Sequence, residues 1–207
     1  MVTKTQEQIL QLLLGRPEER LSIRGIARLL GKSYTLTYNN VQGLVKQDFV
    51  EKQSIPPAQV IQLKDGIPTS VLVGVERKTA EIFLEKHHWI KLYLKDVLNA
   101  TPPFFIMLVF GSYAKGTQTK ESDLDLLIIV PAKEDIPGME KAAQQYTNVK
   151  KGIVVVDAQN FTEMIKNPEE LSVGIEAKKH HMLLYGTEPY YALVKRSTNG
   201  AFKNKAK

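Results

Sequence analysis

The sequence predicts a protein of the mixed α/β (α+β) class that is built from two parts. The first 64 residues alternate short amphipathic segments with turn signals and end in two short β-type runs around a pair of prolines. From residue 100 on, apolar runs rich in β-formers alternate with helical segments, which is typical of a sheet flanked by helices. A chain of 207 residues is long enough for two small domains, each with its own core.

Three helices and a hairpin are expected in the first part. Apolar residues at helical spacing predict a first helix over residues 5–14. Ser22 and Ser33 each precede a periodic apolar segment and are suited to cap a second and a third helix. Two short strands are then expected at residues 49–53 and 60–63.

This order of three helices and a hairpin resembles a winged helix-turn-helix domain, placed at residues 1–64. The resemblance implies that the third helix enters the major groove of duplex DNA while the hairpin touches the backbone. The expected inner face of that helix is Leu36, Val41, Leu44 and Val45. The expected base-reading face is Tyr34, Thr35, Thr37, Tyr38, Asn39 and Gln42, with phosphates meeting Arg24, Arg28, Lys32 and Lys46. Since the outer face is poor in Arg and Lys, a winged helix used for dimerisation or protein contact is the alternative.

Residues 65–99 are expected to join the two parts. Turn signals at Asp65-Gly66 and Pro68 predict a connector, and a long amphipathic helix is predicted from Arg77 to Asn99. Its apolar residues are too numerous for one narrow stripe. We therefore expect it to pack on both domains or on a second copy of the chain in a homodimer.

The densest chemical signal lies between two predicted strands, at residues 104–110 and 126–130. The first strand leads into Gly-Ser-Tyr-Ala-Lys-Gly, residues 111–116, which reads as a tight turn and a short helical segment. Gly111 allows the backbone to approach a ligand closely, and free backbone N–H groups suit phosphate oxygens.

Two carboxylates precede the second of these strands. Asp123 and Asp125 are two residues apart in an extended segment, so both side chains project from the same face. Carboxylates held side by side repel each other unless a cation lies between them. Hard oxygen ligands of this kind suit Mg²⁺. Together with the glycine turn, the pair suggests a site for a nucleoside triphosphate.

The combined pattern Gly-Ser-x-Ala-x-Gly and Ser-Asp-x-Asp resembles the nucleotidyltransferase core of the DNA polymerase β superfamily, most closely its minimal, antitoxin-type members. The resemblance covers about residues 90–195, within a domain placed at residues 100–196. It implies that Gly111 and Ser112 bind the β- and γ-phosphates of an NTP, with ATP expected, and that Lys115 neutralises triphosphate charge. It also implies that Asp123 and Asp125 hold Mg²⁺ and catalyse transfer of a nucleoside monophosphate to a protein or RNA hydroxyl.

The sequence departs from this family at the third predicted strand, residues 153–157. Members of the family carry a third acid inside this strand, and the matching positions here are Val154 or Val155. Asp157 stands at the strand's end, and we expect its carboxylate to lie more than about 5 Å from Asp123 and Asp125, too far to share an ion. Either a shift of register brings it in, or the third carboxylate is absent.

An absent third acid leaves two further functions open. One is a DNA-binding transcriptional regulator whose transferase domain only binds nucleotide or mediates assembly. The other is an antitoxin-like subunit that acts on a partner toxin. Whether the protein is an enzyme is therefore not decided by the sequence.

The composition of the chain excludes several classes of protein and site. The chain has no cysteine, which rules out disulfides, thiolate metal sites and cysteine catalysis. No apolar run approaches the roughly 20 residues of a membrane span, and the polar N-terminus lacks a signal-peptide core, so we expect a cytoplasmic protein. The net charge of +6 favours polyanionic partners, and residues 197–207 read as a frayed basic tail.

Overall fold

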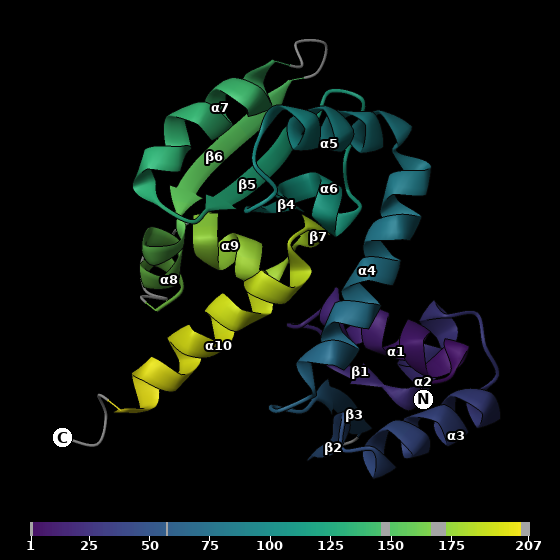
Figure 1. Ribbon diagram of the computed structural model, residues 1–207. Coiled ribbons are helices and arrows are strands. Elements are labelled where there is room, and N and C mark those ends of the chain that lie inside the picture. Colours follow the sequence, from purple (N-terminus) through teal and green to yellow (C-terminus); the bar gives the residue numbers. More distant parts are fainter. Residues whose placement is uncertain (1, 57, 146–149, 167–172, 204–207) are drawn as a thin grey trace. The chain divides into compact units, whose positions relative to one another are not determined.

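The structure is a computed structural model that describes residues 2–56, 58–145, 150–166 and 173–203 (Figure 1). The chain divides into two compact units, Met1–Val75 and Glu76–Lys207. Each unit has its own sheet and its own hydrophobic core. The predicted mixed helix-and-strand class is confirmed. Among the described helices, none is both long and apolar enough to cross a membrane.

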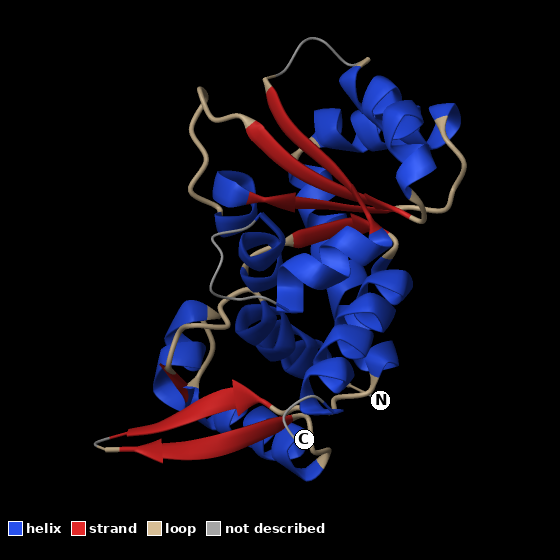
Figure 2. Cartoon of the chain, turned by 90° about the vertical axis from the view of Figure 1, so that its left-hand side faces the viewer, coloured by secondary structure: helices blue, strands red, loops and turns tan. Residues whose placement is uncertain are grey.

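The first unit contains three helices and a small antiparallel sheet. The helices are α1 (Lys4–Leu14), α2 (Ile23–Leu29) and α3 (Tyr34–Lys46), and the strands are β1 (Leu21–Ser22), β2 (Val50–Ile55) and β3 (Ala58–Leu63). The strand order is β1-β3-β2, and Figure 2 shows β2 and β3 as a long hairpin. This is a winged helix-turn-helix fold, as the sequence predicts. The short strand β1 was not expected.

Serine caps fix where α2 and α3 begin. The Ser22 hydroxyl accepts a hydrogen bond from the Gly25 amide at 3.1 Å, and the Ser33 hydroxyl accepts one from the Leu36 amide at 3.3 Å. Both serines have extended backbone, the usual geometry of an N-cap residue. The predicted caps are therefore confirmed.

The turn predicted at Asp65-Gly66 is present, but the connector ends earlier than expected and the single long helix is wrong. Two helices occupy this region, α4 (Thr69–Lys86) and α5 (His88–Ala100). Pro68 begins the first of them, because its carbonyl accepts hydrogen bonds from the amides of Val71 and Leu72. The helices are separated at His87, whose φ of −124° and ψ of 65° are not helical.

The second unit is built on a four-stranded mixed sheet. Its strands are β4 (Ile106–Phe110), β5 (Leu124–Val130), β6 (Lys151–Asp157) and β7 (Met182–Tyr185), in the order β6-β5-β4-β7. Strand β5 is parallel to β6 and antiparallel to β4, and β4 is also antiparallel to β7. The middle strands β4 and β5 are buried on both faces, which explains their unbroken apolar sequences.

Helices cover both faces of this sheet (Figure 1). Helix α5 and helix α7 (Ile136–Gln144), which follows the 3-10 turn Lys133–Asp135, pack over the side chains of Met107, Leu126 and Ile128. The opposite face carries α8 (Ala158–Lys166), α9 (Val173–Lys179) and α10 (Thr187–Lys203). The basic tail expected from residue 197 is helical as far as Lys203. The helix break predicted at residues 167–168 lies outside the described residues.

Candidate functional site

Asp125 lies at the point where three strands of the second unit meet. It is the second residue of β5 and pairs with Phe110 at the end of β4 and with Gly152 on β6. A Cβ on Gly152 would lie 2.9 Å from Asp125 Oδ1, and a Cβ on Gly111 would overlap Asp125 Oδ2. Gly111 also has a φ of +66°, which L-residues with side chains rarely adopt. Two glycines therefore make room for this one carboxylate.

The carboxylates of Asp123 and Asp125 have no partner in the described part of the chain: neither makes a hydrogen bond or an ion pair there. Asp123 is exposed just before β5, and Asp125 is half-buried. Burial raises the pKa of the Asp125 carboxyl above its ordinary value of 3.8. The negative charges of Glu176 and Asp123 raise this pKa further, while the Lys115 ammonium lowers it. The ionised carboxylate is thus held in surroundings that favour a cation.

The predicted phosphate-binding turn is the helix α6 (Gly111–Lys115), which directly follows β4. Gly116 ends it with a φ of +69°, the left-handed conformation of a glycine C-cap. Ser112 is half-buried at its start. Lys115 is exposed, and its Nζ lies 2.9 Å from Glu176 Oε1 on α9. Strand order and this short helix therefore bring Gly111, Ser112 and Lys115 to the same end of the sheet as Asp125.

Glu176 is a residue of this site that the sequence did not reveal. It lies 61 positions after Lys115, on a helix whose preceding residues 167–172 are not described. No motif surrounds it. Only the structure places Glu176 in the site, through its ion pair with Lys115 and the effect of its charge on the pKa of Asp125.

Asp157 does not belong to the site. The β5–β6 register pairs it with Val130, five positions along the strand from Asp125, which is about 16 Å at the ordinary rise per residue. Its carboxylate instead accepts hydrogen bonds from the Asn160 amide at 2.8 Å and from Asn160 Nδ2 at 2.7 Å. The prediction that Asp157 is too far to share an ion is confirmed. Asp157 therefore caps the start of α8.

The register also decides which valine of β6 faces the carboxylates. Gly152 pairs with Asp125 and Val154 pairs with Leu127, so both lie on the face of Asp125. Val155 lies on the other face and packs against the main core of the second unit. The family resemblance allows Val154 or Val155 as the position of the third acid. Only Val154 lies on the same face as Asp125, and valine cannot bind a metal ion or accept a proton.

Mg²⁺ suits the donor atoms that are present. Among the described residues, no group of three or more His, Cys, Asp and Glu side chains is arranged to hold a metal ion. The two carboxylates fit part of an Mg²⁺ ligand set, because Mg²⁺ usually takes one or two protein carboxylates and completes its shell with water and substrate phosphates. The two carboxylates therefore suit an Mg²⁺ ion whose remaining ligands are water and the phosphates of a triphosphate.

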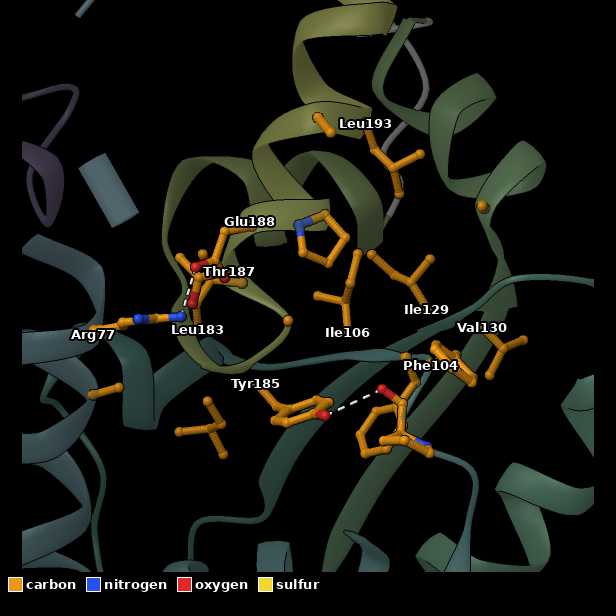
Figure 3. Close-up of a pocket in the computed structure, with 18 of the residues that line it drawn as sticks. Arg77, Phe104, Ile106, Ile129, Val130, Leu183, Tyr185, Thr187, Glu188 and Leu193 are labelled. Carbon is orange, nitrogen blue, oxygen red and sulfur yellow. Dashed lines mark hydrogen bonds and ion pairs between the residues drawn. The ribbon is translucent and has the colours of Figure 1, made fainter. Parts of the chain in front are cut away.

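A large cavity of the second unit lies elsewhere (Figure 3). It has a volume of about 810 Å³ and is lined mainly by apolar side chains of α4, β4, β7 and α10. An ion pair between Arg77 and Glu188, 2.6 Å long, borders it. The cavity reaches Ile106 and Ile129, which pair with each other. They lie four positions along the β4–β5 ladder from Asp125, a distance of about 13 Å along the strand. This cavity is separate from the carboxylates.

The proposed DNA-reading face of α3 is placed only in part as expected. Thr35, Tyr38 and Asn39 are exposed, as is Tyr34, whose ring stacks on that of Tyr38 with centroids 6.1 Å apart. Gln42 is half-buried.

Two positions of α3 were assigned to the wrong face. Thr37 is fully buried and its hydroxyl donates to the Ser33 carbonyl at 3.0 Å, so it cannot read bases. Leu36, expected inside, has 44% of its surface exposed. The reason is that Thr37 lies one turn before Val41 on the helix, so it shares the inner face, and its polar group is satisfied within the same turn.

Comparison with known proteins gives one family match. Residues 106–181 match the model of a family described as nucleotidyltransferase domain. No curated protein matches the sequence.

Two solved structures are similar to the chain. One is a mutant of MepR from a multidrug-resistant S. aureus clinical isolate, with 17% identity and a TM-score of 0.34 over 44% of this chain and 64% of MepR. The other is a toxin–antitoxin with AMP-PNP, with 18% identity and a TM-score of 0.39 over 55% of this chain and 86% of the other. Neither score is high enough to define a shared fold.

The matched residues contain all of β4, α6, β5 and β6, together with Asp123, Asp125 and Glu176. Strands β4, β5 and β6 belong to a mixed sheet flanked by helices, and a sheet flanked by helices is what the sequence predicts. Residues 106–181 are therefore similar to a nucleotidyltransferase domain, and they follow a unit of three helices and a hairpin.

Proposed function

We propose that the chain is a Mg²⁺-dependent nucleotidyltransferase that transfers a nucleoside monophosphate from an NTP to an acceptor hydroxyl. The observation that carries the proposal is the Asp125 carboxylate. It is half-buried and unpartnered in the described structure, it has space only because Gly111 and Gly152 lack a Cβ, and Asp123 lies two residues before it. A structural role would not require an unpaired carboxylate in this position.

The residues around Asp125 have distinct roles in this proposal. Gly111 and Ser112 lie against the β- and γ-phosphates, the former through its backbone and the latter through its hydroxyl. Lys115 offers a positive charge to the triphosphate. Mg²⁺ held by Asp123 and Asp125 would offset charge that develops on the phosphates. The acceptor oxygen forms a bond to the α-phosphorus as the bond to pyrophosphate breaks, so most of the catalysis is positioning and charge stabilisation.

Incubation with ATP labelled at the α-phosphate tests this proposal. We expect label to become attached to a protein or RNA acceptor only when Mg²⁺ is present, with one pyrophosphate released per transfer. Label at the γ-phosphate should not be transferred. If purified protein with candidate protein and RNA acceptors releases no pyrophosphate, transfer is not its function.

A regulator that only binds nucleotide is the second candidate, and one observation favours it. Strand β6 has no acid on the face of Asp125, since Gly152 and Val154 occupy it and Asp157 caps α8. Such a protein would bind NTP in a saturable, Mg²⁺-dependent manner and leave it intact. The labelling experiment distinguishes the two, because only the transferase releases pyrophosphate.

We further propose that the first unit binds duplex DNA through α3. Its outer face presents Thr35, Asn39 and the Tyr34–Tyr38 stack, and the ammonium of Lys52 in the hairpin lies 5.7 Å from the centre of the Tyr38 ring. Aromatic and amide side chains can contact base edges, and cations near them can contact phosphates. Arg24 and Arg28 are exposed on α2, where a winged helix crosses the backbone.

Replacing both Arg24 and Arg28 by alanine should weaken duplex binding. Each lost phosphate contact should reduce the slope of log K against log salt by about 0.9, because fewer counterions are released. Fluorescence anisotropy at several salt concentrations measures the slope. Lys95→Ala, an exposed cation on α5 of the second unit, is the matched control and should leave the slope unchanged. Equal slopes for the double variant and the unmodified protein would refute the assignment of this surface.

The homodimer stays a prediction. Two apolar side chains of α4 and α5 are exposed, Ile82 by 40% and Leu92 by 57%, which is the kind of surface that a second copy would cover. Sedimentation of the full chain measures the association directly.

A further inference from the structure

The transfer that we propose needs a proton acceptor. A hydroxyl oxygen attacks phosphorus effectively only as it loses its proton, and a positioned carboxylate is a common acceptor. Asp123 and Asp125 are assigned to the cation, so their oxygens are engaged. Strand β6 offers no carboxylate on the face of Asp125. The acceptor must therefore come from another element.

Glu176 on α9 is the acid that lies beside the site. Its Oε1 is 2.9 Å from the Nζ of Lys115, the last residue of α6. Helix α9 contacts β4 and β5, the two strands that pair at Phe110 and Asp125. The side chain of Glu176 is 46% exposed, so an acceptor can reach it from solvent.

Helix α9 is held firmly enough to orient Glu176. The next residue, Ala177, is fully buried, and its carbonyl oxygen lies 2.7 Å from His181 Nδ1. His181 Nε2 is 3.4 Å from Glu76 Oε1, and the Tyr191 hydroxyl donates to the same oxygen at 3.0 Å. Glu76 is 95% buried, since only 5% of its surface is exposed. Contacts to α4 and α10 thus fix the backbone on which Glu176 stands.

We propose that Glu176 accepts the proton of the acceptor hydroxyl, and that Lys115 leaves Glu176 for the triphosphate when NTP binds. The Lys115–Glu176 pair is exposed on both sides, with 41% and 46% of the side chains accessible, so exchanging it for a phosphate contact costs little. The free carboxylate then takes the O–H proton as the oxygen bonds to the α-phosphorus and pyrophosphate departs. This role rests on the proposed transfer function.

Glu176→Gln separates the two parts of the proposal, because it keeps the shape and removes the charge. Without its competitor for Lys115, the variant should bind Mg²⁺·NTP about 2- to 5-fold more tightly, the range expected for loss of an exposed ion pair. Its transfer rate should fall about 100-fold or more, as for loss of a general base. Affinity is measured with a non-hydrolysable ATP analogue at saturating Mg²⁺, and transfer by pyrophosphate release.

Glu188→Gln is the matched control. Glu188 also forms an exposed ion pair, 2.6 Å long with Arg77, but it borders the cavity at the far end of the β4–β5 ladder. Both measurements should be unchanged in this variant.

Two results would overturn the inference: a Glu176→Gln variant that transfers at the unmodified rate, or one that binds the analogue more weakly than the unmodified protein. If the unmodified protein binds NTP but transfers nothing, the proposed function fails and the proton-acceptor role fails with it. In that case the change in NTP affinity of Glu176→Gln still tests whether Lys115 moves from Glu176 to the triphosphate.

Discussion

Asp125→Asn will abolish Mg²⁺-dependent NTP binding and reduce transfer by about 1,000-fold or more. The amide fits the space between Gly111 and Gly152 that the carboxylate occupies, so the fold is retained. What the variant loses is the negative charge and one oxygen ligand. Binding is measured with the non-hydrolysable ATP analogue, with Mg²⁺ and with EDTA.

The same variant should be more stable than the unmodified protein when no divalent ion is present. Burial and the nearby charges of Glu176 and Asp123 raise the pKa of Asp125 in the folded state. Between the ordinary value of 3.8 and that raised pKa the folded protein binds more protons than the unfolded chain, so stability falls as pH rises through this window. At neutral pH the folded state carries the full free-energy cost of the ionised Asp125 carboxylate, and Asp125→Asn removes this cost. The gain in Tm should vanish below about pH 3.8.

Asp96→Asn is the control for both measurements. Asp96 is an exposed acid on α5 of the same unit, and its replacement removes the same charge from a position outside the site. It should alter neither NTP binding nor the pH dependence of Tm. Unchanged Mg²⁺-dependent binding in Asp125→Asn would show that the carboxylate pair is not the metal site.

The sequence was sufficient to predict the local elements that carry strong signals. Strands β4 and β5 are apolar throughout because helices cover both of their faces, and Ser22 and Ser33 begin helices because they satisfy free amides. The glycine turn and the two aspartates lie within 15 residues of each other, so their proximity follows from one strand–helix–strand unit. The family match agrees with that pattern.

The sequence was insufficient where tertiary contacts decide. Thr37 is polar and is predicted to face outward, but its hydroxyl donates a hydrogen bond to the carbonyl of Ser33 one turn earlier and the residue is buried. The position of Thr37 around the helix axis of α3 determines that it is buried, and its polarity alone does not. Glu176 is an ordinary exposed acid in the sequence. Only the packing of α9 brings it to Lys115, and no local periodicity encodes such a contact.

Glu76→Ala should lower the free energy of unfolding by about 3 kcal/mol, because it breaks a buried network. The carboxylate of Glu76 is 95% buried and is contacted by the Tyr191 hydroxyl at 3.0 Å and by His181 Nε2 at 3.4 Å. Removing it leaves both of those polar groups without their partner and leaves a small void. Urea-induced unfolding measured by tryptophan fluorescence gives the value.

Two companion variants show why the loss should be large. Glu81→Ala removes an acid from the same helix, but Glu81 is 61% exposed and pairs with Lys78 at the surface, so less than about 0.5 kcal/mol should be lost. Glu76→Gln keeps an oxygen that can accept from Tyr191 and loses only the charge toward His181, so its loss should lie between the other two. Because His181 also contacts the Ala177 carbonyl, Glu76→Ala should weaken transfer as well as stability. If Glu76→Ala cost no more than Glu81→Ala, the network would not anchor α9, and the orientation of Glu176 would need another cause.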